Sequence, residues 1–80
     1  MNTFHLVISS VGETQFDGAA VSATFPGSEG EFTLLAHHEP FVSTLAPGRI
    51  IVRGGPEGTK EFSVDSGILE CAGNRAVALL

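Results

Sequence analysis

Glycine and proline recur along the whole sequence, and their spacing limits the chain to short extended segments. Ten glycines and four prolines are spread over 80 residues, and neither residue is well tolerated inside a long helix. In the segment before the first glycine, Gly12, the residues Phe4, Leu6 and Ile8 occupy every second position. A period of two is that of a strand with one buried face. Since no segment shows helical spacing of apolar residues over a helical length, we predict an all-β fold.

Nine segments carry the strand pattern. They are Thr3–Ser9, Thr14–Asp17, Ala19–Phe25, Glu31–Leu35, Phe41–Leu45, Arg49–Arg53, Thr59–Val64, Ile68–Cys71 and Arg75–Leu80. Turns separate them, including one at Ser10–Glu13 and a hairpin loop at Gly54–Gly58. Such a series predicts an antiparallel β-sandwich or flattened barrel of about ten short strands in two sheets. Two sheets are needed because a single small sheet would leave an apolar face in water.

The same alternation predicts which residues point into the core. The candidates are Phe4, Leu6, Ile8, Val21, Phe25, Phe32, Leu34, Leu45, Ile50, Val52, Phe62, Val64, Val77 and Leu79. Replacing one of the central phenylalanines with alanine is expected to cost roughly 3–5 kcal/mol. That is most of the stability of so small a domain.

The length fits a single domain, which we expect to span residues 1–80. A chain of this size buries only about 60–65% of its unfolded surface. No apolar run approaches the roughly 20 residues of a membrane span, and the N-terminus lacks the basic start of a signal peptide. The single cysteine, Cys71, cannot form an internal disulfide, which fits a reducing compartment.

Charge is distributed unevenly along the chain. All four basic residues follow Gly48, whereas Glu13, Asp17, Glu29, Glu31 and Glu39 precede it, within a net charge of −5. Nucleic acid and anionic membranes are poor partners for the acidic part, because phosphate binding needs clustered lysine and arginine. A basic protein loop is a better partner, since complementary potentials speed and orient docking. The alternative is that the acids serve solubility alone.

The segment Phe25–Gly48 is the most informative about function. Residues Pro26–Gly30 predict a reversal of the chain, because proline fixes φ and glycine opens turn conformations. Glu29 and Glu31 lie on this turn without a basic residue nearby in the sequence. A second Pro-Gly turn follows at Pro47–Gly48. These features suit a rigid β scaffold that displays a charged loop.

No catalytic constellation is evident. His37-His38-Glu39 is a candidate metal site, but neighbouring strand residues point to opposite faces and would not direct both imidazoles at one ion. The glycine-rich segment Gly27–Gly30 lacks the lysine of a phosphate-binding loop, and no serine lies in a nucleophile-elbow setting. We interpret Cys71 as a small apolar strand residue. The sequence therefore predicts a protein without enzymatic activity of its own and without a cofactor.

Several short motifs, in order, resemble those of a known family. They are FHL at Phe4–Leu6, Phe16-x-Gly18, PGSEGE at Pro26–Glu31, His38-x-Pro40, Leu45-x-Pro47-Gly48 and SGILE at Ser66–Glu70. The order resembles the N-terminal β-sandwich domain of the epsilon subunit of bacterial rotary ATP synthases. The resemblance implies a ten-stranded sandwich at the foot of the central stalk, bound to the gamma subunit and seated on the ring of c subunits.

The family resemblance also implies a role and a location. A subunit of this family is a non-catalytic part of the rotor that supports coupling of proton or sodium flow to ATP synthesis. It lies in a peripheral complex at the cytoplasmic face of the inner (plasma) membrane. Position by position, the resemblance assigns the contact with the c ring to Ser28, Glu29, Gly30 and Glu31. It assigns the contact with gamma to Ser10, His38 and Ser43.

The sequence departs from the family pattern at several positions. Ala36-His37 stands where the family usually has Pro-Gly, Thr33 replaces a usual glycine, and Glu39 replaces a usual alanine and adds a charge beside His38. Family members also continue into a C-terminal helical hairpin, whereas this sequence stops at Leu80; the expectation is a coupling subunit without helix-borne inhibition. One alternative is a free-standing β-sandwich that binds a metal or small ligand through His37, His38 and Glu39. Another is a structural domain whose partner is not an ATP synthase.

Overall fold

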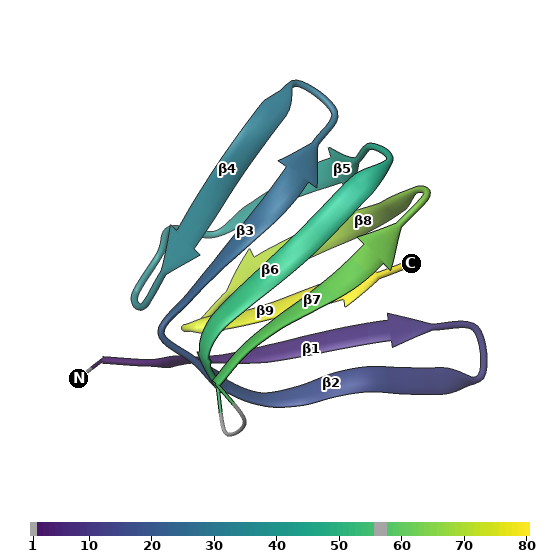
Figure 1. Ribbon diagram of the computed structural model, residues 1–80. Helices are drawn as coiled ribbons and strands as arrows, with labels where there is room; N and C mark the ends of the chain where they lie inside the picture. Colours follow the sequence, from purple (N-terminus) through teal and green to yellow (C-terminus); the bar gives the residue numbers. More distant parts are fainter. Residues whose placement is uncertain (1, 56–57) are drawn as a thin grey trace.

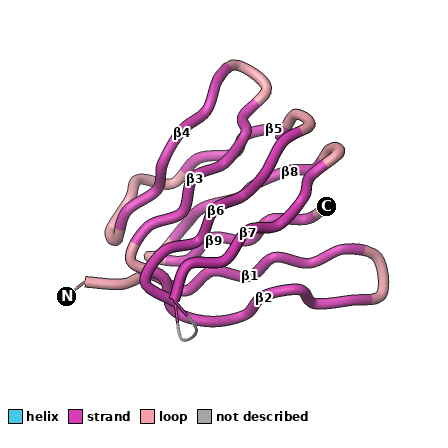
Figure 2. Tube along the Cα trace, viewed as in Figure 1, coloured by secondary structure: helices cyan, strands magenta, loops and turns pink. Residues whose placement is uncertain are grey.

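The computed structural model describes residues 2–55 and 58–80, which form nine β-strands and no helix (Figure 2). The strands are β1 (Phe4–Ser10), β2 (Glu13–Ala20), β3 (Ser22–Gly27), β4 (Gly30–Leu35), β5 (Phe41–Leu45), β6 (Gly48–Gly55), β7 (Gly58–Val64), β8 (Gly67–Ala72) and β9 (Arg75–Leu79). The all-β class is confirmed, with nine strands in the described part where about ten were predicted. The predicted loop Gly54–Gly58 includes Pro56 and Glu57, which lie outside the described residues.

The strands form two layers that face each other (Figure 1). One layer has the order β2-β1-β9-β8-β5, and the other has the order β4-β3-β6-β7. The layers are continuous at one corner, where Gly27 of β3 pairs with Leu45 of β5. The fold is therefore a β-sandwich whose layers are joined along one side. This agrees with the predicted sandwich or flattened barrel.

One strand pair departs from the antiparallel arrangement that we predicted. β1 runs parallel to β9, with Leu6 opposite Ala76 and Ile8 opposite Ala78, whereas the other described pairs are antiparallel. Most of the chain separates the two strands, so no tight turn between them fixes their direction. Their pairing brings the first and last strands side by side in the five-stranded layer.

One apolar core fills the space between the layers. Its buried residues are Phe4, Leu6, Ile8, Ala20, Ala23, Phe25, Leu34, Leu45, Ile50, Val52, Val64, Leu69, Cys71, Ala76 and Ala78. Most of the predicted inward residues are among them. Phe32 and Phe62 are only partly buried and pack against the core at its margin.

The prediction for β9 was wrong about which face is buried. Ala76 and Ala78 point into the core, whereas Val77 is only partly buried and Leu79 is 47% exposed. The strand is apolar on both faces, so alternation could not decide between them. The register with β1 determines which face of β9 is buried. It places the two alanines in the same cross-strand rows as the buried Leu6 and Ile8.

β2 is longer than we predicted. Gly18 was expected to end it, but Gly18 pairs with Leu6 and the strand continues to Ala20. The chain then bends at Val21, a predicted core residue that is only partly buried. A Cβ atom at Gly54 would collide with the Val21 side chain, so glycine is needed there. This bend carries the chain from one layer to the other.

Candidate protein-interaction site

Four turns lie at the same end of the sandwich, here called the turn end; two close hairpins and two cross between the layers. The strand registers align the ends of β1, β9, β5 and β3 with the start of β8. The β1–β2, β3–β4, β5–β6 and β7–β8 turns therefore share this end (Figure 1); their residues are Val11-Gly12, Ser28-Glu29, Ala46-Pro47 and Asp65-Ser66. The β4–β5 connection and the β8–β9 turn lie at the opposite end.

The β3–β4 hairpin has a two-residue tip, Ser28-Glu29. Gly27 and Gly30 pair with each other directly beneath it. A Cβ atom at Gly27 would lie 2.6 Å from the Gly30 carbonyl oxygen and 2.8 Å from the ring of Phe32. Gly30 has a φ of 132°, a conformation that other residues rarely adopt. Both glycines are therefore needed for so tight a reversal, as the sequence predicted.

Hydrogen bonds fasten this tip to β5. The Ser28 N–H donates to the Thr44 carbonyl oxygen at 3.0 Å, and the Ala46 N–H donates to the Pro26 carbonyl oxygen at 2.7 Å. The Thr44 hydroxyl also donates to the Ser28 hydroxyl at 2.8 Å. These bonds extend the pairing of β3 with β5 around the corner of the sandwich. The tip is therefore held by the body as well as by its own hairpin.

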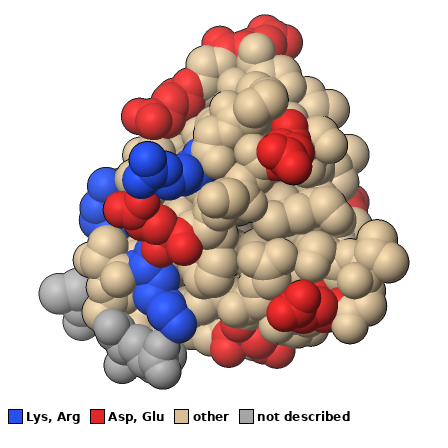
Figure 3. All heavy atoms as spheres, turned by 45° about the vertical axis from the view of Figure 1, so that its right-hand side comes forward, with Lys and Arg blue, Asp and Glu red and all other residues tan. Residues whose placement is uncertain are grey.

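The turn end is acidic. Its exposed carboxylates belong to Glu13, Glu29, Glu31 and Asp65. Arg49 lines the same surface hollow as Glu31, but its guanidinium donates to Glu61 at 2.7 Å. Within residues 2–55 and 58–80, no ion pair joins Glu29 or Glu31 to a cation. Figure 3 shows acidic side chains from the level of the β3–β4 turn down to the lower edge, with the basic ones gathered at the left of the view.

The residues that the resemblance assigned to the gamma contact do not form one cluster. Ser10 lies at the turn end, where its hydroxyl accepts a hydrogen bond from Gln15. His38 lies at the opposite end, with its ring at right angles to that of Phe4. The length of β1 separates these ends by roughly 20 Å. Ser43, midway along β5, is half-buried and shares a cross-strand row with core residues of β8 and β9.

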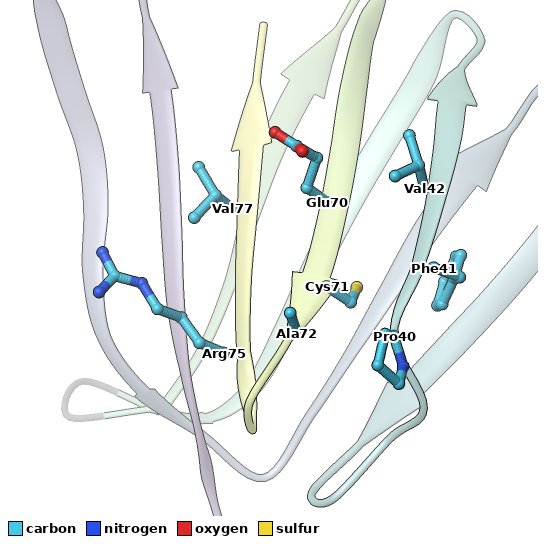
Figure 4. Close-up of a pocket in the computed structure, with 8 residues that line it drawn as sticks. All are labelled: Pro40, Phe41, Val42, Glu70, Cys71, Ala72, Arg75 and Val77. Atoms are coloured by element: carbon cyan, nitrogen blue, oxygen red, sulfur yellow. The ribbon is translucent and has the colours of Figure 1, made fainter.

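The outer surface of the five-stranded layer carries an apolar face that we did not predict. Its residues come from four adjacent strands and are Val7, Val42, Ile68, Val77 and Leu79, with the exposed Glu70 between Val42 and Val77 in the same row. Val42 is 62% exposed. Figure 4 shows Val42, Glu70 and Val77 on three neighbouring strands around a hollow, with Arg75 reaching toward β2. The feature of the sequence that indicated this face was the wholly apolar segment Ala76–Leu80. A strand that is apolar on both faces needs to be shielded from water on both.

The outer surface of the other layer is mostly polar, with Leu35 as its exposed large apolar residue. Thr24 is buried there beneath Arg53, which donates to the Thr24 hydroxyl at 3.0 Å. The same hydroxyl is 2.9 Å from that of Thr33. Arg49 and Glu61 form their ion pair on the same layer. The contrast between the layers shows that the apolar face is a property of one side of the molecule and not of the whole surface.

The His37-His38-Glu39 segment does not assemble a metal site. Among the described residues, no three histidine, cysteine, aspartate or glutamate side chains lie close enough together to hold an ion. The His38 ring is turned toward the body, where its Nδ1 lies 2.9 Å from the Leu35 carbonyl oxygen. Burial raises the pKa of the Cys71 thiol to about 11, so the thiolate is disfavoured. No helix in the described part of the chain could cross a membrane.

The fold and these two surfaces define a small β-sandwich domain of the kind that contacts other proteins. A family model described as the beta-sandwich domain of the ATP synthase delta/epsilon chain matches residues 3–79. The chain belongs to this family.

Relatives agree with this assignment. The chain is 39% identical to the ATP synthase epsilon chain of Wolbachia pipientis wMel, over 92% of this chain and 65% of the relative. It is 36% identical to the epsilon chain of Bradyrhizobium sp. BTAi1, over 100% of this chain and 58% of the relative. The chain thus spans about six tenths of the length of these curated relatives.

Solved structures share the fold. This chain matches a chain of the Euglena gracilis mitochondrial ATP synthase (OSCP/F1/c-ring) with a TM-score of 0.87, at 22% identity over 99% of this chain and 51% of that one. It matches a chain of the Tetrahymena thermophila mitochondrial ATP synthase (central stalk/c-ring) with a TM-score of 0.77, at 16% identity over 94% of this chain and 60% of that one. At these identities the likeness concerns the fold.

Proposed function

We propose that this domain acts in the central stalk of an ATP synthase, where it links the gamma subunit to the c ring. In this role it helps to couple ion flow to ATP synthesis and performs no catalysis itself. The observation that carries the proposal is the division of the surface into an acidic turn end and an apolar outer face. Two chemically different surfaces at different places on one rigid body suit a protein that joins two partners.

The turn end is the proposed contact with the c ring, through Ser28, Glu29, Gly30 and Glu31. Glu29 and Glu31 are exposed and form no ion pair with a cation among the described residues, which favours a partner that supplies positive charge. The family resemblance provides such a partner, because the polar loops of the ring carry a basic residue. A tip fastened to β5 holds these carboxylates in place before docking, which limits the entropy lost on binding.

The apolar outer face is the proposed contact with gamma. Exposed apolar residues gathered on one sheet face mark a surface that another protein covers. Ser10, His38 and Ser43, which the resemblance assigns to this contact, come from strands β1 and β5 of this layer and from the connection before β5. We therefore extend the gamma contact to Val42 and Ile68 on the outer face, with Ser10 and His38 at opposite ends of this layer. Ser43 lies in the inward-facing row beside Val42.

The complex that this proposal requires lies at the cytoplasmic face of the inner (plasma) membrane. The domain would reach the membrane only through the ring. Co-purification tests the proposal: the tagged chain, produced together with gamma and the c subunits, should retain both partners through size-exclusion chromatography. Recovery of the tagged chain without either partner, under conditions where gamma and the ring associate, would refute it.

A further inference from the structure

Thr44 connects the acidic tip to the apolar outer face. Its hydroxyl donates to the Ser28 hydroxyl at 2.8 Å, and its carbonyl oxygen accepts from the Ser28 N–H at 3.0 Å. On its other side, Thr44 lies opposite Ile68 of the apolar face. One residue of β5 therefore touches the tip and borders the second surface.

The tip needs a support of this kind. Ser28 and Glu29 are exposed and are flanked by Gly27 and Gly30, and glycine gives the backbone more freedom than any other residue. Because both side chains are exposed, burial does little to hold them. The hydrogen bonds from β5 are therefore the restraints that fix the tip relative to the body. Among them, the Thr44 hydroxyl makes the bond that a side-chain substitution can remove.

We propose that Thr44 is a positioning residue for the contact with the c ring. Its hydroxyl holds Ser28 and thereby fixes the direction in which the carboxylates of Glu29 and Glu31 are presented. A tip that is ordered before docking loses less conformational entropy on binding, so affinity rises without a new contact. That the partner is the c ring rests on the proposed function. The hydrogen bonds that order the tip are independent of it.

Thr44→Val tests the proposal, because valine keeps the β-branched shape and removes the hydroxyl. In the full chain assembled with gamma, this variant should bind the c ring about threefold to tenfold more weakly, the equivalent of one hydrogen bond. Thr44→Ser should restore the affinity. Thr14→Val is the matched control, since Thr14 lies at the far edge of the same cross-strand row and its side chain makes no hydrogen bond within the described residues.

Two further measurements separate positioning from general stability. Amide hydrogen exchange at the Ser28 N–H, in the chain without partners, should be faster in Thr44→Val than in the wild type and normal in Thr44→Ser. In a double-mutant cycle with Ser28→Ala, the two losses of ring affinity should not add, because both substitutions break the same bond.

Ring binding by Thr44→Val equal to that of the wild type would overturn this inference and leave the proposed function intact. Failure of the wild-type chain to bind the ring would instead overturn the proposed function. Exchange at Ser28 would then still decide whether Thr44 orders the tip.

Discussion

The backbone N–H of His37 donates a 2.6 Å hydrogen bond to the side-chain oxygen of Asn74. Their φ angles are 60° and 58°, and they are the non-glycine residues with positive φ in the described part of the chain. The Asn74 side-chain nitrogen also donates to the Thr3 carbonyl oxygen at 2.9 Å. One amide side chain therefore joins the chain start, the β4–β5 connection and the β8–β9 turn.

Asn74→Ala should lower the free energy of unfolding by about 1–3 kcal/mol, because it removes both hydrogen bonds and leaves an alanine at positive φ. Asn74→Gly should be less harmful, since glycine accepts that backbone conformation. Urea denaturation measures both effects. The exposed Asn2 provides a control, and equal stability of Asn74→Ala and Asn2→Ala would contradict the prediction.

Phe25→Ala should cost roughly 3–5 kcal/mol of unfolding free energy, through lost burial and the cavity left behind. Phe25 is fully buried and stacks on Phe32 with ring centroids 5.6 Å apart. Phe41→Ala should cost less, because Phe41 is 36% exposed and its ring packs on Phe32 at the margin of the core, with centroids 5.5 Å apart. Thermal unfolding of both variants checks the order, and a similar loss at the two sites would disprove it.

Much of this fold could be predicted from the sequence because its signals are local. Gly27 and Gly30 mark the β3–β4 reversal, and Phe4, Leu6 and Ile8 show the buried face of β1. The direction and register of β9 could not be predicted in this way. They depend on pairing with β1 across most of the chain, and the all-apolar segment Ala76–Leu80 suits either face equally.

The pH dependence of stability should contain a contribution from Cys71 at alkaline pH. Burial raises the pKa of its thiol from the ordinary value of 9.0 to about 11, so the unfolded chain releases this proton first. The contribution is complete below pH 9 and is lost as the pH rises through 11. The stability of the wild type relative to Cys71→Ala should therefore decline between these values. If the free energies of unfolding of the two proteins depended on pH in the same way, this prediction would be wrong.

Glu31→Lys should weaken attachment to the c ring while leaving the unfolding free energy within about 0.5 kcal/mol of the wild type, because the side chain is exposed. Attachment of the wild type should also weaken as salt is added, since the attraction is screened. Glu39→Lys, at the end opposite the turn end, is the charge-matched control. Co-purification with the ring measures all three. Equal recovery of the ring with Glu31→Lys and wild type would argue against this contact.

Val42→Asp should weaken binding to gamma by about tenfold or more, because a second carboxylate would have to be buried beside that of Glu70. Leu35→Asp is the control: Leu35 is 60% exposed, similar to Val42 at 62%, but lies on the other layer. Both variants should remain folded, as circular dichroism can verify. Equal affinity for gamma in the two variants would remove the apolar face from the proposed interface.

The acidic tip and the apolar outer face differ in how well they could be predicted from the sequence. The acidic tip was predicted, because Glu29 and Glu31 sit on a turn that glycine spacing defines. The apolar face was missed, because Val42, Ile68 and Val77 come from three strands whose alignment depends on long-range pairing. The bond from Thr44 to Ser28 was missed for the same reason, since β5 meets the tip only at the corner between the layers.

Because β1 and β9 are parallel neighbours, the first strand begins at one end of the body and the last strand finishes at the other. Opposed forces applied at Phe4 and Leu79 would act along the β1–β9 pair. They would load all of its hydrogen bonds at the same time, in shear. A hairpin pulled apart from its open end yields one bond at a time. The parallel pairing of β1 with β9 thus lets the domain resist stretching between its two end strands.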